Sequence, residues 1–229
     1  MSKRKAEREA RKIVRDYTLA IGGSILVALI IRFFLLEAYR MPSRAMQPAV
    51  EPGDTLFVSK FSYGFRIPFT DRRASEKAPT YGDVAVMAFP DEPGREYIKR
   101  IVGLSGDSVQ LVKGALVLNG KTVTEIPSGE ALCTTETLPG GKTYPVCFEP
   151  PLLSTDSPIR VPEGSVFAVG DLRVSPNEIR KMKTQGIVPI GNLRGRAEFV
   201  WLSIQPPNTA GGGEWFSRIR FNRIFKRIE

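Results

Sequence analysis

The sequence contains no histidine and only two cysteines. Without histidine, the chain cannot form a Ser-His-Asp triad, a Cys-His dyad or a metal site with histidine ligands. Two cysteines also cannot form a zinc site that needs four thiolates. We therefore predict neither a metal ion nor a cofactor. If the protein is a hydrolase, its general base must be another group, and a lysine whose pKa is lowered by desolvation can act as one.

The charges are unevenly distributed along the chain. The formal net charge is +9 over 229 residues, of which 42% are hydrophobic, enough for one or two globular domains. Seven of the first sixteen residues are basic and three are acidic, while five of the last twelve are basic. Because the basic residues gather at the two ends, we expect contact with an anionic membrane surface rather than with nucleic acid.

A long run with a single charged residue, called the uncharged run below, follows the first basic segment. Residues 17–36 contain one charged residue, Arg32, which lies near the end of the run and can extend to the membrane interface. A helix of this length just spans a hydrocarbon core. A cleaved signal peptide is the alternative, but the run is longer than a usual h-region and no cleavage motif follows it. We predict a cytoplasmic segment over 1–16, a transmembrane helix over 17–36 and an extracytoplasmic domain over 37–229.

The chain beyond residue 37 is rich in short β-type runs that glycine and proline separate. The clearest runs are 55–59, 84–89, 97–102, 108–111, 115–118, 165–169 and 197–204. This pattern predicts a mainly-β domain. The dipeptide Asn119-Gly120, at the centre of 116–123, predicts a hairpin. Residues 120–163 are richer in proline, threonine, serine and glutamate, and we expect them to form a β-rich insertion on the main sheet.

Both cysteines, Cys133 and Cys147, lie in this expected insertion. Outside the cytoplasm such a pair readily forms a disulfide. Closing a loop of this size stabilises a fold by ~3 kcal/mol in the chain-entropy model. Two buried free thiols are the alternative. Neither cysteine has a basic neighbour in sequence that would favour a nucleophilic role.

Several motifs follow one another in the order of a known family. They include Pro-Ser-Arg-Ala-Met-Gln-Pro (42–48), Tyr-Ile-Lys-Arg (97–100), Gly-Asp-Leu-Arg (170–173) and Gly-Arg-Ala (195–197). In this order they resemble bacterial type I signal peptidase, the membrane-bound Ser/Lys protease that removes signal peptides. The resemblance implies an antiparallel β-sheet catalytic domain and a single-pass anchor in the bacterial inner membrane. It also implies that a monomer acts at the lipid bilayer on the signal peptides of preproteins.

The resemblance assigns roles to residues of the first two motifs. The family's nucleophile is the second serine of Pro-Ser-x-Ser-Met-x-Pro, and Ala45 occupies that position here, so we predict that this chain is inactive. Met46 belongs to the same structural motif. Lys99 corresponds to the general base, and its apolar surroundings in sequence favour a lowered pKa; an exposed lysine on an edge strand is the alternative. Ser43 and the N–H of Ala45 correspond to the oxyanion hole.

The third motif departs further from the family pattern. Leu172 replaces the usual asparagine, and the serine that orients the lysine is displaced, with Ser175 as the nearest candidate. We expect Asp171 to brace the loop and Arg180 to belong to a structural ion pair.

The candidate site lies close to the membrane in this interpretation. Only five residues separate the uncharged run from Pro42. Small residues before a scissile bond require shallow apolar pockets, for which Ile98, Met87 and Phe89 are candidates. The aromatic segment 61–69 is expected to form either an interfacial hairpin or a core strand.

Three functions therefore remain open at this point. The first is a type I signal peptidase with its nucleophile replaced. The second is a natural pseudoprotease that binds signal peptides or regulates a partner without cleavage. The third is a membrane-anchored β-domain with a structural role, against which Lys99 argues, because a lysine buried without a use is costly.

Overall fold

The structure is a computed structural model of the whole chain. It describes residues 2–30, 36–64, 75–92, 94–124, 133–150, 152, 154–155, 157–173, 186–207 and 215–228. Most of the aromatic segment predicted at 61–69, and the end of the third motif with Ser175 and Arg180, lie outside the described residues.

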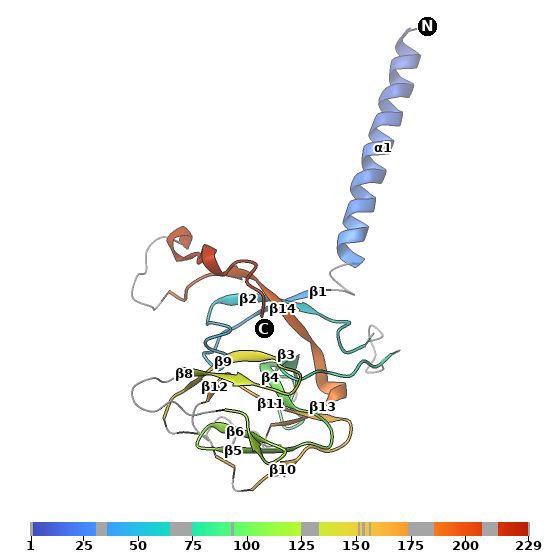
Figure 1. Cartoon of the computed structure of the whole chain (residues 1–229). Helices are drawn as coiled ribbons and strands as arrows, with labels where there is room; N and C mark the ends of the chain where they lie inside the picture. Colours follow the sequence, from blue (N-terminus) through green and yellow to red (C-terminus); the bar gives the residue numbers. More distant parts are fainter. Residues whose placement is uncertain are drawn as a thin grey trace.

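The first element is a single long helix, α1 (Ser2–Ile30), which extends away from the β-sheets (Figure 1). The helix begins well before residue 17, because the basic segment is rich in lysine, arginine, glutamate and alanine, which are good helix formers. Among the described residues, no helix combines the length and the apolar character needed to cross a membrane. The end of the transmembrane helix predicted over 17–36 falls on residues 31–35, which are outside the described ranges.

A seven-stranded antiparallel sheet forms the main body of the molecule, as the β-type runs predicted. In the order of the sheet, its strands are β1 (Leu36–Arg40), β2 (Asp54–Ser59), β14 (Leu193–Ser203), β3 (Val84–Met87), β4 (Tyr97–Gly103), β11 (Ser165–Val169) and β13 (Ile187–Pro189). The long strand β14 pairs with both β2 and β3, so the first and last parts of the chain lie side by side.

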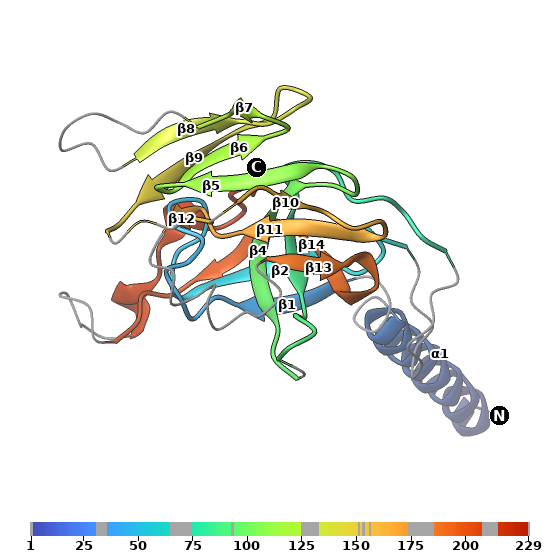
Figure 2. The ribbon, with the colours of Figure 1, turned by 90° about the horizontal axis from the view of Figure 1, so that it is seen from below.

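Two smaller sheets lie together at the end of the molecule away from α1 (Figures 1 and 2). One contains β10 (Ile159–Arg160), β5 (Ser108–Val112), β6 (Ala115–Leu118) and β7 (Lys121–Thr122); the other contains β12 (Leu172–Arg173), β9 (Thr143–Phe148) and β8 (Cys133–Thr137). Apart from the parallel pair β12–β9, their strands are antiparallel. Most of these strands come from the region expected to be an insertion.

The hairpin predicted around Asn119-Gly120 is confirmed. Leu118 pairs with Lys121 across a two-residue turn in which both central residues have positive φ, at 51° and 78°. This conformation matches the right-handed twist of the two strands and is easiest for asparagine followed by glycine.

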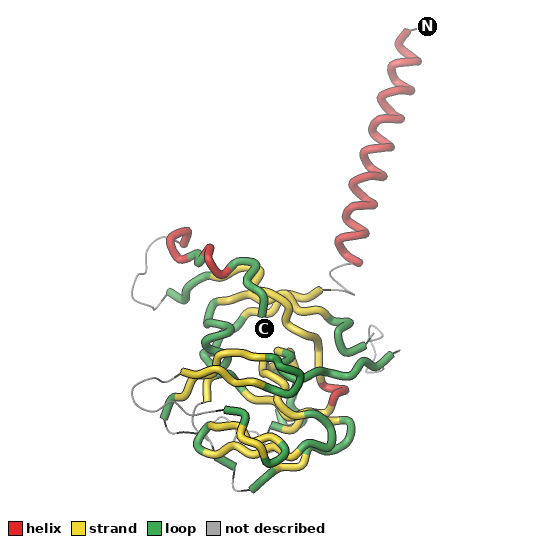
Figure 3. Tube along the Cα trace, viewed as in Figure 1, coloured by secondary structure: helices red, strands yellow, loops and turns green. Residues whose placement is uncertain are grey.

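Helical structure after α1 is limited, among the described residues, to short 3-10 turns (Figure 3). These are η2 (Ile190–Asn192), η3 (Trp215–Arg218) and η4 (Phe221–Arg223). The segment with η3 and η4 turns back onto the main sheet, where Phe199 bridges Arg227 and Ile204 bridges Ile219.

One buried ion pair connects the three-stranded sheet to the main sheet, and a second lies within the three-stranded sheet. Arg100 of β4 donates two hydrogen bonds of 2.7 Å to the Asp171 carboxylate, and both side chains are fully buried. The guanidinium of Arg100 also lies 3.9 Å from the ring centroid of Tyr144 on β9. A second buried pair joins Arg173 of β12 to Glu136 of β8 at 2.8 Å. The Arg100–Asp171 pair holds the third motif against β4, and the Arg173–Glu136 pair holds it against β8.

Candidate active site

The first motif forms a tight loop between β1 and β2. The loop is closed by backbone hydrogen bonds from Gln47 N–H to Arg44 O (2.9 Å) and from Val50 N–H to Met46 O (2.8 Å). The side chain of Met46 is fully buried in a hydrophobic cluster that also contains Ala45 and Ile98. Burial of Met46 therefore sets the depth at which residue 45 lies. Ser43, two residues before Ala45, is exposed to solvent.

The backbone N–H of Ala45 has no hydrogen-bond partner among the described residues. Its carbonyl oxygen, in contrast, accepts a hydrogen bond of 3.2 Å from the N–H of Leu172. The third motif thus supports residue 45 through its carbonyl and leaves its N–H available as a donor.

Lys99 lies in β4, opposite Ala85 of β3 in the antiparallel register. Only 8% of Lys99 is exposed to solvent, and its neighbours Ile98 and Arg100 are also buried. The alternative of an exposed lysine on an edge strand is therefore wrong, since β4 is paired on both sides, with β3 and β11. The lysine of the second motif is held within the main sheet.

One cavity brings the first two motifs together. Its volume is about 400 Å³, and Ser43, Ala45 and Lys99 all line it. The rest of its wall is formed by Tyr39, Arg40, Met41, Pro42, Val86, Glu92, Arg95, Glu96, Tyr97 and Ile98. A cavity of this size, lined by both apolar and polar side chains, is typical of a ligand site.

Two tyrosines of the cavity wall, Tyr39 and Tyr97, lie next to carboxylates. Burial, followed by the carboxylates of Glu96 and Glu37, raises the pKa of Tyr39, which therefore stays protonated and donates hydrogen bonds. Tyr97 packs edge-on against Phe89 at 5.4 Å and hydrogen-bonds to Glu92. Burial and the hydrogen bond to Glu92 also raise the pKa of Tyr97, so both tyrosines line the cavity as neutral groups.

Residues 14–202 match the family described as "Signal peptidase, peptidase S26". The chain belongs to the signal peptidase S26 family. It is 30% identical to signal peptidase I of Rickettsia typhi, over 96% of each chain. It is 33% identical to signal peptidase I of Pseudomonas aeruginosa, over 84% of this chain and 74% of the relative. A crystal structure of a signal peptidase I from Enterococcus faecalis V583 matches with 26% identity, covering 53% of this chain and 98% of that one, with a TM-score of 0.33.

The pocket residues predicted for this S26 family member are only partly brought together. Ile98 lines the cavity, but Met87 and Phe89 are not among its lining residues and are buried in a different hydrophobic cluster. Side chains alternate along a strand, so Met87 and Phe89 face away from Val86. Val86 pairs directly with Ile98 and lines the cavity in their place.

Asp171, expected from the sequence to brace the loop, forms an ion pair with a partner that the sequence did not indicate. Its buried carboxylate accepts two hydrogen bonds from the guanidinium of Arg100, the residue next to Lys99 in β4. Leu172 donates its backbone N–H to the Ala45 carbonyl, a contact that does not depend on the Leu172 side chain.

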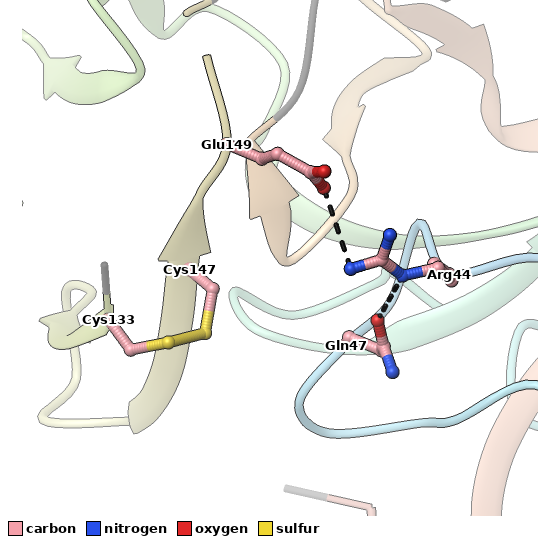
Figure 4. The surroundings of a disulfide bond; sticks show 5 residues. All are labelled: Arg44, Gln47, Cys133, Cys147 and Glu149. Atoms are coloured by element: carbon pink, nitrogen blue, oxygen red, sulfur yellow. Dashed lines mark hydrogen bonds and ion pairs between the residues drawn. A yellow bond between two sulfur atoms is a disulfide. The ribbon is translucent and has the colours of Figure 1, made fainter. Parts of the chain in front are cut away.

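A further group of residues, drawn in Figure 4, comprises the disulfide Cys133–Cys147, Glu149 and two residues of the loop that carries residue 45, Arg44 and Gln47. Glu149, two residues after Cys147, lies 3.6 Å from the guanidinium of Arg44. Arg44 also donates a hydrogen bond of 2.9 Å to Gln47 within the loop. No local pattern in the sequence marks the Arg44–Glu149 pair, because its members are far apart in the chain.

Proposed function

We propose that this chain is a type I signal peptidase in which Ala45 occupies the nucleophile position, so that it binds preproteins without cleaving them. The observation that carries the proposal is the cavity, which Ser43, Ala45 and Lys99 line together. The family membership supports the reaction class. Because the sequence contains no histidine, the base must be another group, and Lys99 lines the cavity where it can act as one.

In the proposed reaction, a serine oxygen at position 45 would attack the carbonyl carbon of the scissile peptide bond. Lys99 would take the serine proton, because it is buried, lines the same cavity as residue 45, and a lysine serves as the base in the Ser-Lys variants of serine catalysis. The developing oxyanion would accept hydrogen bonds from the N–H of residue 45 and the hydroxyl of Ser43. The methyl group of Ala45 has no lone pair for the attack, so the chain as it stands stops at binding.

The restoration experiment tests this proposal. Purified Ala45→Ser protein in detergent should cleave a preprotein that has small residues before the scissile bond. The rate should rise by orders of magnitude over Ala45, because loss of a catalytic serine costs about 10⁶-fold in kcat. The double change Ala45→Ser with Lys99→Ala should return the rate to background. Retained cleavage in the double variant would exclude Lys99 as the base.

A natural pseudoprotease is the second candidate, and Ala45 together with Leu172 favours it. In that case Ala45→Ser protein should fold and bind signal peptide but remain unable to cleave it. Ser175 is the residue we propose for orienting the lysine; if no group fills that role, the restored hydroxyl stays unactivated.

We also propose that residues 17–36 anchor the chain in the bacterial inner membrane. The support is the uncharged run in the sequence, which follows seven basic residues. The β-domain would then lie outside the cytoplasm, where signal peptides of exported proteins emerge from the bilayer. Partner molecules would be the lipid bilayer and the preprotein, with the chain acting as a monomer.

A further inference from the structure

The hairpin formed by β8 and β9 ends beside the loop that carries residue 45. Glu149 is the first residue after β9, and its carboxylate contacts Arg44, the residue directly before Ala45 (Figure 4). Because Arg44 also bonds to Gln47, the contact reaches both sides of the nucleophile position. Both charged side chains are substantially exposed, so this link by itself is weak.

A second link runs through the short strand β12. Cys147 of β9 pairs with Leu172 of β12, and the Cys147 N–H donates to the Asp171 carbonyl at 3.0 Å. The Leu172 N–H in turn donates to the Ala45 carbonyl at 3.2 Å. A single strand of two residues therefore separates the disulfide-bearing strand from the backbone of residue 45.

The disulfide lies at the end of the hairpin where both links begin. Cys133 and Cys147 form the last pair of the β8–β9 register, at the open end, whereas Thr137 and Thr143 pair next to the turn. The open end of a hairpin separates first when local structure opens. A covalent bond at this pair holds the end of β9 against the third motif.

We propose that the disulfide Cys133–Cys147 and Glu149 position the loop that carries residue 45, and so set the rate of the chemical step. Both are positioning groups, since neither lines the cavity. The claim that these groups set the rate of the chemical step rests on the proposed function. The claim that they position the loop does not.

Hydrogen exchange of the full chain, with Ala45 in place, tests the positioning of the loop. In the variant Cys133→Ala with Cys147→Ala, the amides of Gln47, Val50 and Leu172 should exchange about tenfold faster or more. Amides of the β5–β6 hairpin should exchange as before. Unchanged exchange at the three amides would overturn the proposal. Equal acceleration everywhere would also overturn it, because it would show that the disulfide only stabilises the whole fold.

Glu149→Gln provides a test that keeps the disulfide. In the Ala45→Ser background, it should lower kcat about two- to fivefold with little change in KM, as expected for loss of an exposed ion pair. The cysteine double variant should lower kcat about tenfold or more, because small displacements of a reacting group are costly. Glu163→Gln is the matched control, as Glu163 is an exposed carboxylate before β11, and it should leave kcat unchanged.

The two readouts separate the two claims. If Ala45→Ser protein with an intact disulfide does not cleave, the proposed function fails, and hydrogen exchange still decides the positioning claim. If it cleaves and both Glu149→Gln and the cysteine variant retain full kcat, the positioning claim fails and the proposed function stands.

Discussion

At the scale of single residues, Gly170 shows how closely the third motif approaches the loop that carries residue 45. A Cβ atom at this position would lie 2.3 Å from the Ala45 carbonyl oxygen and 3.3 Å from its carbonyl carbon. Both are backbone atoms, so no side-chain rotation can relieve the contact. The same oxygen accepts the hydrogen bond from Leu172 N–H. Glycine is therefore required by the close approach of two backbones.

Gly170→Ala should displace the loop and lengthen the Leu172–Ala45 hydrogen bond. We expect a loss of about 1–3 kcal/mol in the free energy of unfolding, as for other overpacked sites. Urea denaturation would measure it. Gly191→Ala is the matched control, because a Cβ there meets nothing within 4 Å, and it should change stability by less than about 0.5 kcal/mol. Equal effects of the two changes would contradict the argument.

Residues of the site that belong to short motifs could be predicted from sequence. Residues whose place depends on which face of a strand they occupy could not. Lys99 and Ala45 were found because a motif fixes their neighbours. Met87 and Phe89 are pocket candidates in the sequence because they are apolar and lie in a β-type run near the expected site. In the structure, the register between β3 and β4 places Val86 beside Ile98. This register decides which side chains of β3 face the cavity, and a single sequence does not show it.

At the scale of elements, local turn chemistry predicted the β6–β7 hairpin, whereas the contacts between elements needed the fold. Arg100 and Asp171 are 71 residues apart, and Arg173 and Glu136 are 37 apart. No local propensity marks such pairs in a sequence. They form because buried charges must be paired, which is a constraint of the packed interior.

The C-terminal segment is fastened to the start of β2 by a cluster of charges. Arg223 donates to the Asp54 carboxylate at 2.6 Å, and Arg220 lies 3.2 Å from the same group. The hydroxyl of Ser203 donates to it at 2.7 Å, and Glu51 contributes its N–H at 2.9 Å. Burial acts to raise the pKa of Asp54, but these hydrogen bonds outweigh it and lower the pKa below the ordinary value of 3.8.

Acid should therefore weaken this attachment. A carboxylate with a lowered pKa in the folded state contributes stability that is present above its unfolded pKa and is lost as the pH falls through the folded value. The free energy of unfolding should drop between pH 5 and about pH 2, and the drop should be smaller in Asp54→Asn than in the unchanged chain. Urea denaturation at several pH values would measure both. Identical pH profiles would show that Asp54 is not the responsible group.

At the scale of the whole molecule, the charge asymmetry of the N-terminal segment bears on how the chain would lie at a membrane. Seven basic and three acidic residues precede the uncharged run, and basic residues next to a span favour the cytoplasmic side. Acidic residues contribute little to this preference. The β-domain, with its disulfide between Cys133 and Cys147, would then lie in an oxidising compartment.

Charge reversal near the N-terminus provides the corresponding test. In intact cells, protease added from outside, after permeabilisation of any outer membrane, should digest the β-domain and leave the N-terminal segment protected. Replacing Lys3, Arg4 and Lys5 by glutamate should reduce the fraction of chains with this orientation, because it removes the basic excess that holds the segment inside. Replacing Glu7 and Glu9 by glutamine is the matched control and should leave the orientation unchanged. A β-domain that stays protected until the inner membrane is opened would contradict the anchor and, with it, the proposed action on exported preproteins.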